Sequence, residues 1–279
     1  MPAEADPRPL PIVRALLFDT FGTLTNWEDS ISRLLEAAYG KPAKEEGDAA
    51  EGAREGHTDV DWLVFTRQWR AGYMKRTREI ASGGSGPGNI DDLHLEILNS
   101  LLDQPGNAGL AAAFPSQEKR KELCQLWHRL DAWEDVKPGL EALKQLDPPV
   151  LLATLSNGTL RLLIDLARHS SLPLDAHFSG DLLGSYKPNP KMYLGACGLL
   201  GFGEEERKRG EVAMVASHIK DLKAAAEYGL RTVYVRRSTE DVGIPDGGDA
   251  VKTKAEGGEV DIVLDGAGEG LRALAGLLR

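Results

Sequence analysis

Four short stretches of the chain carry polar side chains of the kinds found in catalytic and binding sites. The first, residues 14–25 (RALLFDTFGTLT), places an acid, Asp19, and a hydroxyl, Thr23, after an apolar run. The polar residues of the other three stretches are Ser156, Asn157, Lys187, Ser217, His218 and Asp221. The combination of a carboxylate, a lysine and several small hydrogen-bonding groups is hard to explain by structural roles alone. The fold must bring the four stretches together for that set to act.

Each of these residues taken singly has a structural explanation. Asp19 could cap a turn, since short acids after strands often do so. Ser156 or Asn157 could cap a helix, and Lys187 could be a solvated loop lysine. His218 could be a residue at an exposed helix start. Only a common location would favour a functional role.

Alternating strands and helices would give these stretches a common location. Apolar runs predict strands at 15–18, 150–155, 177–179, 211–216, 232–236 and 260–264. Helices are predicted between them at 138–146, 160–169, 190–201, 221–228 and 271–278. This alternation predicts an α/β fold with a doubly wound parallel sheet. The carboxyl ends of the strands, where such sheets place their sites, carry the polar stretches.

A helical block interrupts the alternation after the first strand. Helices are predicted at 30–39, 61–80, 91–102 and 116–130, and loops at 41–60, 82–89, 104–115 and 238–259. We therefore expect two domains: an α/β core at 1–27 and 134–279, and a helical cap at 28–133. A cap over the carboxyl edge of the sheet would close a cleft between the two.

Composition narrows the classes of partner. The 279 residues carry a net charge of −10, which argues against nucleic acid and against an anionic membrane surface. A local basic pocket could still bind a small anionic substrate. Cys124 and Cys197 lie far apart in apolar helical stretches and are expected to be free thiols in a reducing compartment. Neither a secretory signal nor an apolar stretch long enough to span a membrane is evident, so we expect a cytoplasmic protein.

The four stretches, in this order and spacing, resemble the motifs of the haloacid dehalogenase superfamily. They read FDTFGTL from residue 18, LSNG from 155, KPNP from 187 and VASHIKDL from 215. The resemblance covers residues 11–24 and 136–278 and implies a Rossmann-like core. It implies that Asp19 is a nucleophile that forms a covalent aspartyl intermediate, with Lys187 holding it ionised. Thr23, Ser156 and Asn157 would orient Asp19 and the substrate.

The chain departs from the magnesium-dependent phosphatases of this superfamily at two places. Those enzymes have a second Asp, a general acid, two residues after the nucleophile, where this chain has Phe21. Their fourth motif has an acidic pair, of which only Asp221 is present here. Mg²⁺ prefers hard oxygen ligands, so the resemblance implies no metal and no cofactor.

The pattern is more similar to the type II 2-haloacid dehalogenases. In that branch Asp attacks the carbon that bears the halogen, and water then cleaves the resulting ester to give a 2-hydroxy acid. An arginine of the helical cap binds the substrate carboxylate or the halide, and Arg70 is at the matching place. The resemblance adds Phe21, Ser156, Asn157, Tyr193 and Ser217 as substrate-binding residues. It makes Asp19, Thr23, Lys187, His218 and Asp221 the catalytic residues. It also implies a homodimer.

Other functions remain open at this point. The cis-epoxysuccinate hydrolases use the same nucleophile and are similar in having a His and an Asp three residues apart, as His218 and Asp221 are. A histidine that titrates near neutral pH could activate water or serve an alkoxide leaving group. A phosphatase is disfavoured by Phe21. A binding protein without catalysis is disfavoured by the intact Asp19 and Lys187.

Overall fold

The computed structural model describes residue 10, residues 12–40 and residues 60–278. Its centre is a parallel sheet with the strand order β3-β2-β1-β4-β5-β6. The strands are β1 (Ala15–Phe18), β2 (Leu151–Leu155), β3 (Ala176–Phe178), β4 (Val212–Ala216), β5 (Arg231–Arg236) and β6 (Ile262–Asp265). The predicted α/β class and doubly wound sheet are confirmed. The order reverses between β1 and β4, which is where sheets of this kind bind ligands.

Strand β1 is buried on both faces, which explains its unbroken apolar run. Leu16 and Phe18 pack into one apolar cluster, while Ala15 and Leu17 pack into the cluster on the opposite face. The register pairs Ala15 with Leu151 of β2 and with Val212 of β4. All three strands therefore end at the same edge of the sheet.

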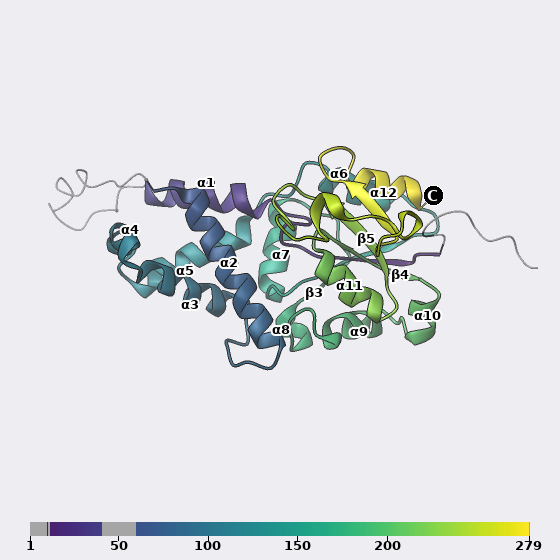
Figure 1. Cartoon of the computed structure of the whole chain (residues 1–279), viewed down its shortest axis with the longest axis horizontal. Coiled ribbons are helices and arrows are strands. Elements are labelled where there is room, and N and C mark those ends of the chain that lie inside the picture. Colours follow the sequence, from purple (N-terminus) through teal and green to yellow (C-terminus); the bar gives the residue numbers. More distant parts are fainter. Residues whose placement is uncertain (1–9, 11, 41–59, 279) are drawn as a thin grey trace, which may run out of the picture.

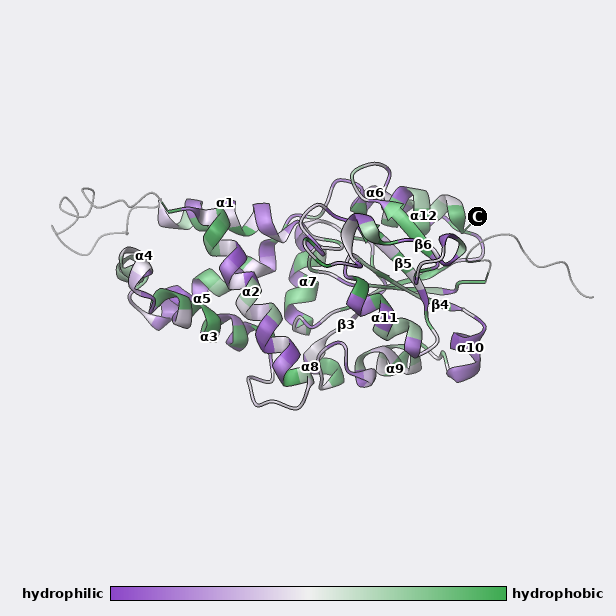
Figure 2. Ribbon diagram, viewed as in Figure 1, coloured by the Kyte–Doolittle hydropathy of each residue, from purple (hydrophilic) through white to green (hydrophobic). Residues whose placement is uncertain are grey.

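Helices cover the two faces of the sheet (Figure 1). On one face α6 (Val136–Leu143) packs against α12 (Leu271–Leu277), and Gly139 permits their close approach because a Cβ there would meet Leu271 at 2.5 Å. On the other face lie α9 (Pro190–Leu199) and α11 (Ile219–Glu227). The remaining helices of this part are α7 (Leu160–His169), α8 (Gly180–Leu183) and α10 (Glu204–Lys208). Figure 2 shows α10 as hydrophilic, in keeping with its exposed, charged sequence.

The inserted block forms a helical body beside the carboxyl edge of the sheet (Figure 1). Its helices are α1 (Trp27–Tyr39), α2 (Trp62–Ala81), α3 (Ile90–Leu102), α4 (Ala108–Ala113) and α5 (Gln117–Cys124). They share an apolar core that contains the fully buried Trp69 and Trp127 and extends to Leu162 and Leu163 of α7. The aromatic residues Phe65, Trp69 and Tyr73 of α2 belong to this core. The division at 27/28 and 133/134 stays a prediction.

Two predictions inside the helical block are wrong. Residues 104–115, predicted as a loop, contain the short helix η2 (Pro105–Asn107) and α4. Leu110 of α4 packs into the core of the helical body, and such tertiary packing, more than helix propensity, stabilises so short a helix. Residues 116–130, predicted as one helix, divide into α5 and the 3-10 helix η3 (Gln125–Arg129). The tighter turn of η3 buries both Trp127 and His128.

The segment 238–259 is also different from the predicted surface loop. It contains the short helices η4 (Gly248–Ala250) and η5 (Lys254–Glu256), and it buries Glu240 and Val251. Most residues of this segment are not buried, as predicted for a surface loop, but Glu240 and Val251 point into the protein interior. The loop predicted at 41–60 lies, except for Val60, outside the described residues.

Two further expectations concern the cysteines and membrane-spanning segments. Cys124 and Cys197 are free and buried, as expected. Burial raises the pKa of the Cys124 thiol to about 12 and that of the Cys197 thiol to about 11, so neither is a reactive thiolate. Among the described residues, no helix is both long and apolar enough to cross a membrane.

Candidate active site

Asp19 lies at the first residue after β1, at the point where the strand order reverses. Its backbone N–H donates to the carbonyl of Val215 at 2.9 Å, which continues the sheet pairing one step beyond Phe18. The chain then turns through Gly22 at a φ of 83°, a conformation that glycine adopts without strain. This turn returns Thr23 to the acid, and the Thr23 hydroxyl donates to Asp19 Oδ2 at 2.8 Å.

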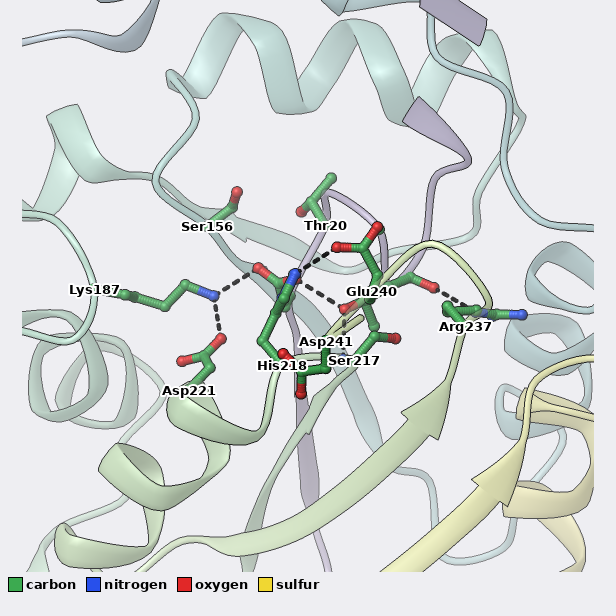
Figure 3. Close-up of polar contacts among 12 residues, drawn as sticks. Thr20, Ser156, Lys187, Ser217, His218, Asp221, Arg237, Glu240 and Asp241 are labelled. Carbon is green, nitrogen blue, oxygen red and sulfur yellow. Dashed lines mark hydrogen bonds and ion pairs between the residues drawn. The ribbon is translucent and has the colours of Figure 1, made fainter. Parts of the chain in front are cut away.

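Lys187 binds two carboxylates at once (Figure 3). Its Nζ lies 2.7 Å from Asp19 Oδ1 and 2.5 Å from Asp221 Oδ2. The hydroxyl of Tyr193 donates to the other oxygen of Asp221 at 2.5 Å. All four side chains are nearly or fully buried, so the ion pairs are protected from screening by solvent. Lys187, Tyr193 and Asp221 thus form one network that ends at Asp19.

The loop after β2 positions the lysine. The side-chain oxygen of Asn157 accepts from the backbone N–H of Lys187 at 2.6 Å. Ser156 is fully buried, and its hydroxyl accepts from the N–H of Gly158 at 3.3 Å. Thr159, rather than Ser156 or Asn157, caps α7. Asn157 therefore holds the backbone of Lys187 in place and does not cap α7.

His218, directly after Ser217, lies between two acids (Figure 3). Its Nδ1 is 3.3 Å from Asp19 Oδ2, and its Nε2 is 2.7 Å from Glu240 Oε2. The backbone N–H of Ser217 donates to the Thr23 hydroxyl at 2.9 Å, which ties the end of β4 to the turn after β1. The Ser217 hydroxyl is buried and has no hydrogen-bond partner among the described residues.

The charges around Asp19 set its protonation state. Burial alone would raise the pKa of Asp19, but Lys187 and His218 outweigh it and hold that pKa well below its ordinary value. Burial would likewise lower the pKa of Lys187, but Asp19 and Asp221 raise it instead. Asp19 is therefore an ionised, desolvated carboxylate at neutral pH, which is the state that a nucleophile needs.

The same balance acts on His218. Burial lowers its pKa, but the hydrogen bonds to Asp19 and Glu240 outweigh burial and raise the pKa to about 10. The expectation of a histidine that titrates near neutral pH is therefore wrong for this arrangement. His218 is a cation with two donors at neutral pH.

Arg70 reaches this region from α2 in the helical body. It is 7 % exposed, and its guanidinium lies 4.7 Å from the ring centre of Tyr73, 5.4 Å from that of Trp27 and 5.5 Å from that of Phe21. No hydrogen bond joins it to an acceptor in the part of the chain that the structure describes. Aromatic faces stabilise the cation but leave its N–H donors free for an anion.

Sequence reasoning missed one acid and part of the aromatic cage. Glu240 touches His218, and Trp27 donates to Glu240 from its indole nitrogen at 2.6 Å. Glu240 lies in a Gly-rich, acidic segment, where composition gives no sign of burial. Tyr73 belongs to the core of the helical body, and its contacts with Arg70 and Phe21 show that its ring also faces the site.

The residues present do not fit a magnesium ion. Asp19 and Asp221 both bind Lys187 Nζ, which occupies the place between the two carboxylates that a cation would take. Phe21 supplies no oxygen ligand. Within the described ranges, no group of three or more His, Cys, Asp or Glu side chains is arranged to hold a metal ion.

A comparison with protein families agrees with this geometry. Residues 13–229 match the model of the haloacid dehalogenase-like hydrolases, and this range holds Asp19, Lys187 and Asp221. The chain belongs to the haloacid dehalogenase-like hydrolases. The sheet and the helical insert match those of solved L-2-haloacid dehalogenases, which is the fold that the sequence resemblance implies.

The curated relatives and the solved structure that this chain resembles are all 2-haloacid dehalogenases. The chain is 28% identical over 231 residues to (S)-2-haloacid dehalogenase 4A of Burkholderia cepacia, covering 81% of this chain and 84% of that protein. It is 27% identical over 231 residues to (S)-2-haloacid dehalogenase 1 of a Pseudomonas species, covering 81% and 85%. A solved defluorinating L-2-haloacid dehalogenase is 32% identical, with a TM-score of 0.75 and coverage of 96% of this chain and 95% of that one.

Proposed function

We propose that this hydrolase removes halide from short 2-haloalkanoic acids and gives 2-hydroxy acids, with Asp19 as the nucleophile. One observation carries the proposal: an ionised, buried carboxylate faces a site whose only nearby unpaired cation among the described residues is Arg70. The two curated relatives are (S)-2-haloacid dehalogenases, which favours the (S) enantiomer as substrate.

Arg70 suits the carboxylate end of such a substrate. Its charge is desolvated and caged by three rings, so an incoming carboxylate can form charge-assisted hydrogen bonds of about 1.5–3 kcal/mol. The ring of Phe21, which lies under Arg70, would contact the substrate carbon chain. A site of this kind accepts a small organic acid and offers no proton donor at position 21.

The reaction follows from the position of Asp19. One carboxylate oxygen attacks C2 of the substrate, the carbon–halogen bond breaks, and halide leaves with the bonding electrons. Water then adds to Cγ of the aspartyl ester, and the bond between Cγ and the substrate oxygen breaks. We assign to Asp221 the removal of the first proton from that water. One proton of the water ends on the product hydroxyl, and the other passes to solvent.

Halide release without metal tests this proposal. We expect the enzyme to release halide from (S)-2-chloropropionate in the presence of EDTA, and to release less from the (R) enantiomer. An Asp19→Asn variant should release none. Turnover of p-nitrophenyl phosphate with Mg²⁺, without any halide release, would contradict the proposal and support a phosphatase.

The charged state of His218 favours a second candidate, hydrolysis of a cis-epoxysuccinate-type epoxide. An imidazolium next to the nucleophile could give its Nδ1 proton to the oxygen that leaves when Asp19 opens the ring. Halide leaves without a proton, so only the epoxide reaction needs this acid. Diol formation from cis-epoxysuccinate, with no halide from any haloacid, would replace the first proposal with this one.

A further inference from the structure

Glu240 is a buried acid in the segment that follows β5, and its carboxylate makes three hydrogen bonds. Oε1 accepts from the indole N–H of Trp27 at 2.6 Å and from the hydroxyl of Thr239 at 2.8 Å. Oε2 is 2.7 Å from Nε2 of His218. Its side chain is 5% exposed, so the carboxylate is fixed in both position and orientation.

The two carboxylates beside the ring favour one state of the imidazole. A ring with an ionised carboxylate at each nitrogen must donate from both nitrogens, and only the imidazolium can do so. Asp19 keeps a second cation, Lys187, whose Nζ lies 2.7 Å from Oδ1, so it does not depend on His218 alone for its charge. Glu240 is therefore the group that decides whether the ring stays charged, because its loss would leave Nε2 without an anion.

We propose that Glu240 is a positioning residue: it holds His218 as an imidazolium with Nδ1–H directed at Asp19 Oδ2, so that Oδ2 carries the negative charge when water adds to the aspartyl ester. This rests on the proposed function, in which Asp19 forms an ester. Oδ2 has two donors, the Thr23 hydroxyl at 2.8 Å and His218 at 3.3 Å. Two preplaced donors at an oxygen that becomes an anion form an oxyanion site.

Other charged groups around His218 agree with this role. Those that act on His218, or on its two carboxylate partners, are Asp19, Glu240, Asp241, Lys187 and Arg70. Burial would raise the pKa of Glu240, but His218 and, to a smaller extent, Arg70 and Trp27 outweigh it and lower that pKa to about 2. Glu240 therefore remains a carboxylate over the whole range in which the enzyme would work.

The kinetic test compares Glu240→Gln with a matched control, Glu211→Gln. Glu211 is also a buried, ion-paired acid, but it lies before β4, at the opposite edge of the sheet. We expect Glu240→Gln to slow ester hydrolysis about tenfold to a hundredfold while ester formation changes less. Rapid-quench assays should then show a burst of halide, and mass spectrometry should find substrate bound to the Asp19 peptide. Kinetics of Glu240→Gln equal to those of Glu211→Gln would overturn the inference.

A titration tests the inference separately from the reaction. The chain has 6 histidines, and loss of one signal in His218→Asn identifies the ring in nitrogen-detected NMR spectra. We expect its pKa of about 10 to fall in Glu240→Gln toward the ordinary value of about 6.5. The pH–rate profile, flat through neutral pH in the natural protein, should then decline as pH rises in the variant.

The two tests separate the two proposals. If no haloacid or epoxide is turned over and Asp19 never carries an ester, the proposed function fails, while the titration still reports whether Glu240 holds His218. If His218 titrates at the same pH in both proteins, the inference is wrong whatever the substrate.

Discussion

Two cations bind opposite oxygens of the Asp19 carboxylate, and at the scale of single residues this decides its reactivity. Lys187 binds Oδ1, and His218 faces Oδ2. A buried carboxylate without such partners would take up a proton, because the charged form loses its hydration. The acid is thus kept both ionised and desolvated, as the attack on carbon proposed above requires.

Replacement of Lys187 by methionine should expose this dependence. Burial would then act on Asp19 with less opposition, so its pKa would rise from a strongly depressed value. Activity would fall at least about a hundredfold and would be lost further as pH falls through the raised pKa. Lys191→Met, an exposed lysine of α9, is the control. A pH-independent rate close to that of the natural protein would contradict this role for Lys187.

Arg70→Gln should raise KM for the haloacid more than it lowers kcat. Loss of charge-assisted hydrogen bonds of about 1.5–3 kcal/mol corresponds to a roughly 10- to 150-fold lower kcat/KM. Arg67→Gln, on the same helix, removes an ion pair between the exposed Arg67 and the mostly buried Glu28, away from the candidate site, and should change kcat/KM little. Equal effects of the two substitutions would show that Arg70 acts on the helix and not on the substrate.

The turn after β1 is the element that admits Glu240 to the site. Gly22 has a φ of 83°, and a Cβ there would lie 2.3 Å from the carboxyl carbon of Glu240. No side chain can be added at this position unless Glu240 moves, and Glu240 is held by both Trp27 and His218. The glycine of the first motif is thus required by a residue more than two hundred positions away.

Gly22→Ala should therefore destabilise the protein more than Gly83→Ala. Both glycines have positive φ, but nothing lies within 4 Å of a Cβ built on Gly83. Backbone strain of about 1 kcal/mol is common to both, and only Gly22→Ala adds the clash with Glu240. Thermal unfolding compares their stability, and activity at a temperature where both are folded compares their sites. An equal loss of stability in the two variants would mean that Glu240 can move away from residue 22 without destabilising the protein.

The elements that sequence predicts well are those with a continuous periodic pattern. The strands and their polar ends follow from apolar runs that stop at Phe18, Leu155 and Ala216. Short helices such as α4 and η3 are held by one or two buried residues, which no periodic pattern marks. Glu240 could not be found, because its burial depends on Gly22, Trp27 and His218 meeting in space. Arg70 was found through the resemblance, not through its helix pattern.

At the scale of the whole molecule, His128 joins the helical body to the sheet part. It lies on η3, and its ring contacts Asp91 of α3 at 3.2 Å and Asp165 of α7 at 3.0 Å. Its side chain is 5% exposed. Burial lowers its pKa, but the hydrogen bonds to these two acids outweigh burial, and the pKa is raised. Stability from this ion pair is fully present below the pKa of the unfolded chain and is lost as pH rises through the raised pKa.

His128→Gln should therefore lower Tm by several degrees at about pH 6, and by less at about pH 9. Loss of a buried charged contact costs about 1–2 kcal/mol, which for a chain of this size is a few degrees. His169→Gln is the control, because His169 pairs with Asp131 at the surface. Thermal melts across this pH range measure the difference. A deficit that grows with pH would contradict a charged His128.

The covalent role of Asp19 is tested most directly by repeated turnover of (S)-2-chloropropionate in ¹⁸O-water, followed by mass spectrometry of the peptide that contains Asp19. If water attacks Cγ of an aspartyl ester, one oxygen of Asp19 is exchanged in each cycle, and the peptide gains mass. The account predicts this label in Asp19, its absence in protein incubated without substrate, and a product hydroxyl that carries the protein's oxygen in a single turnover. Halide release with label only in the product would contradict it.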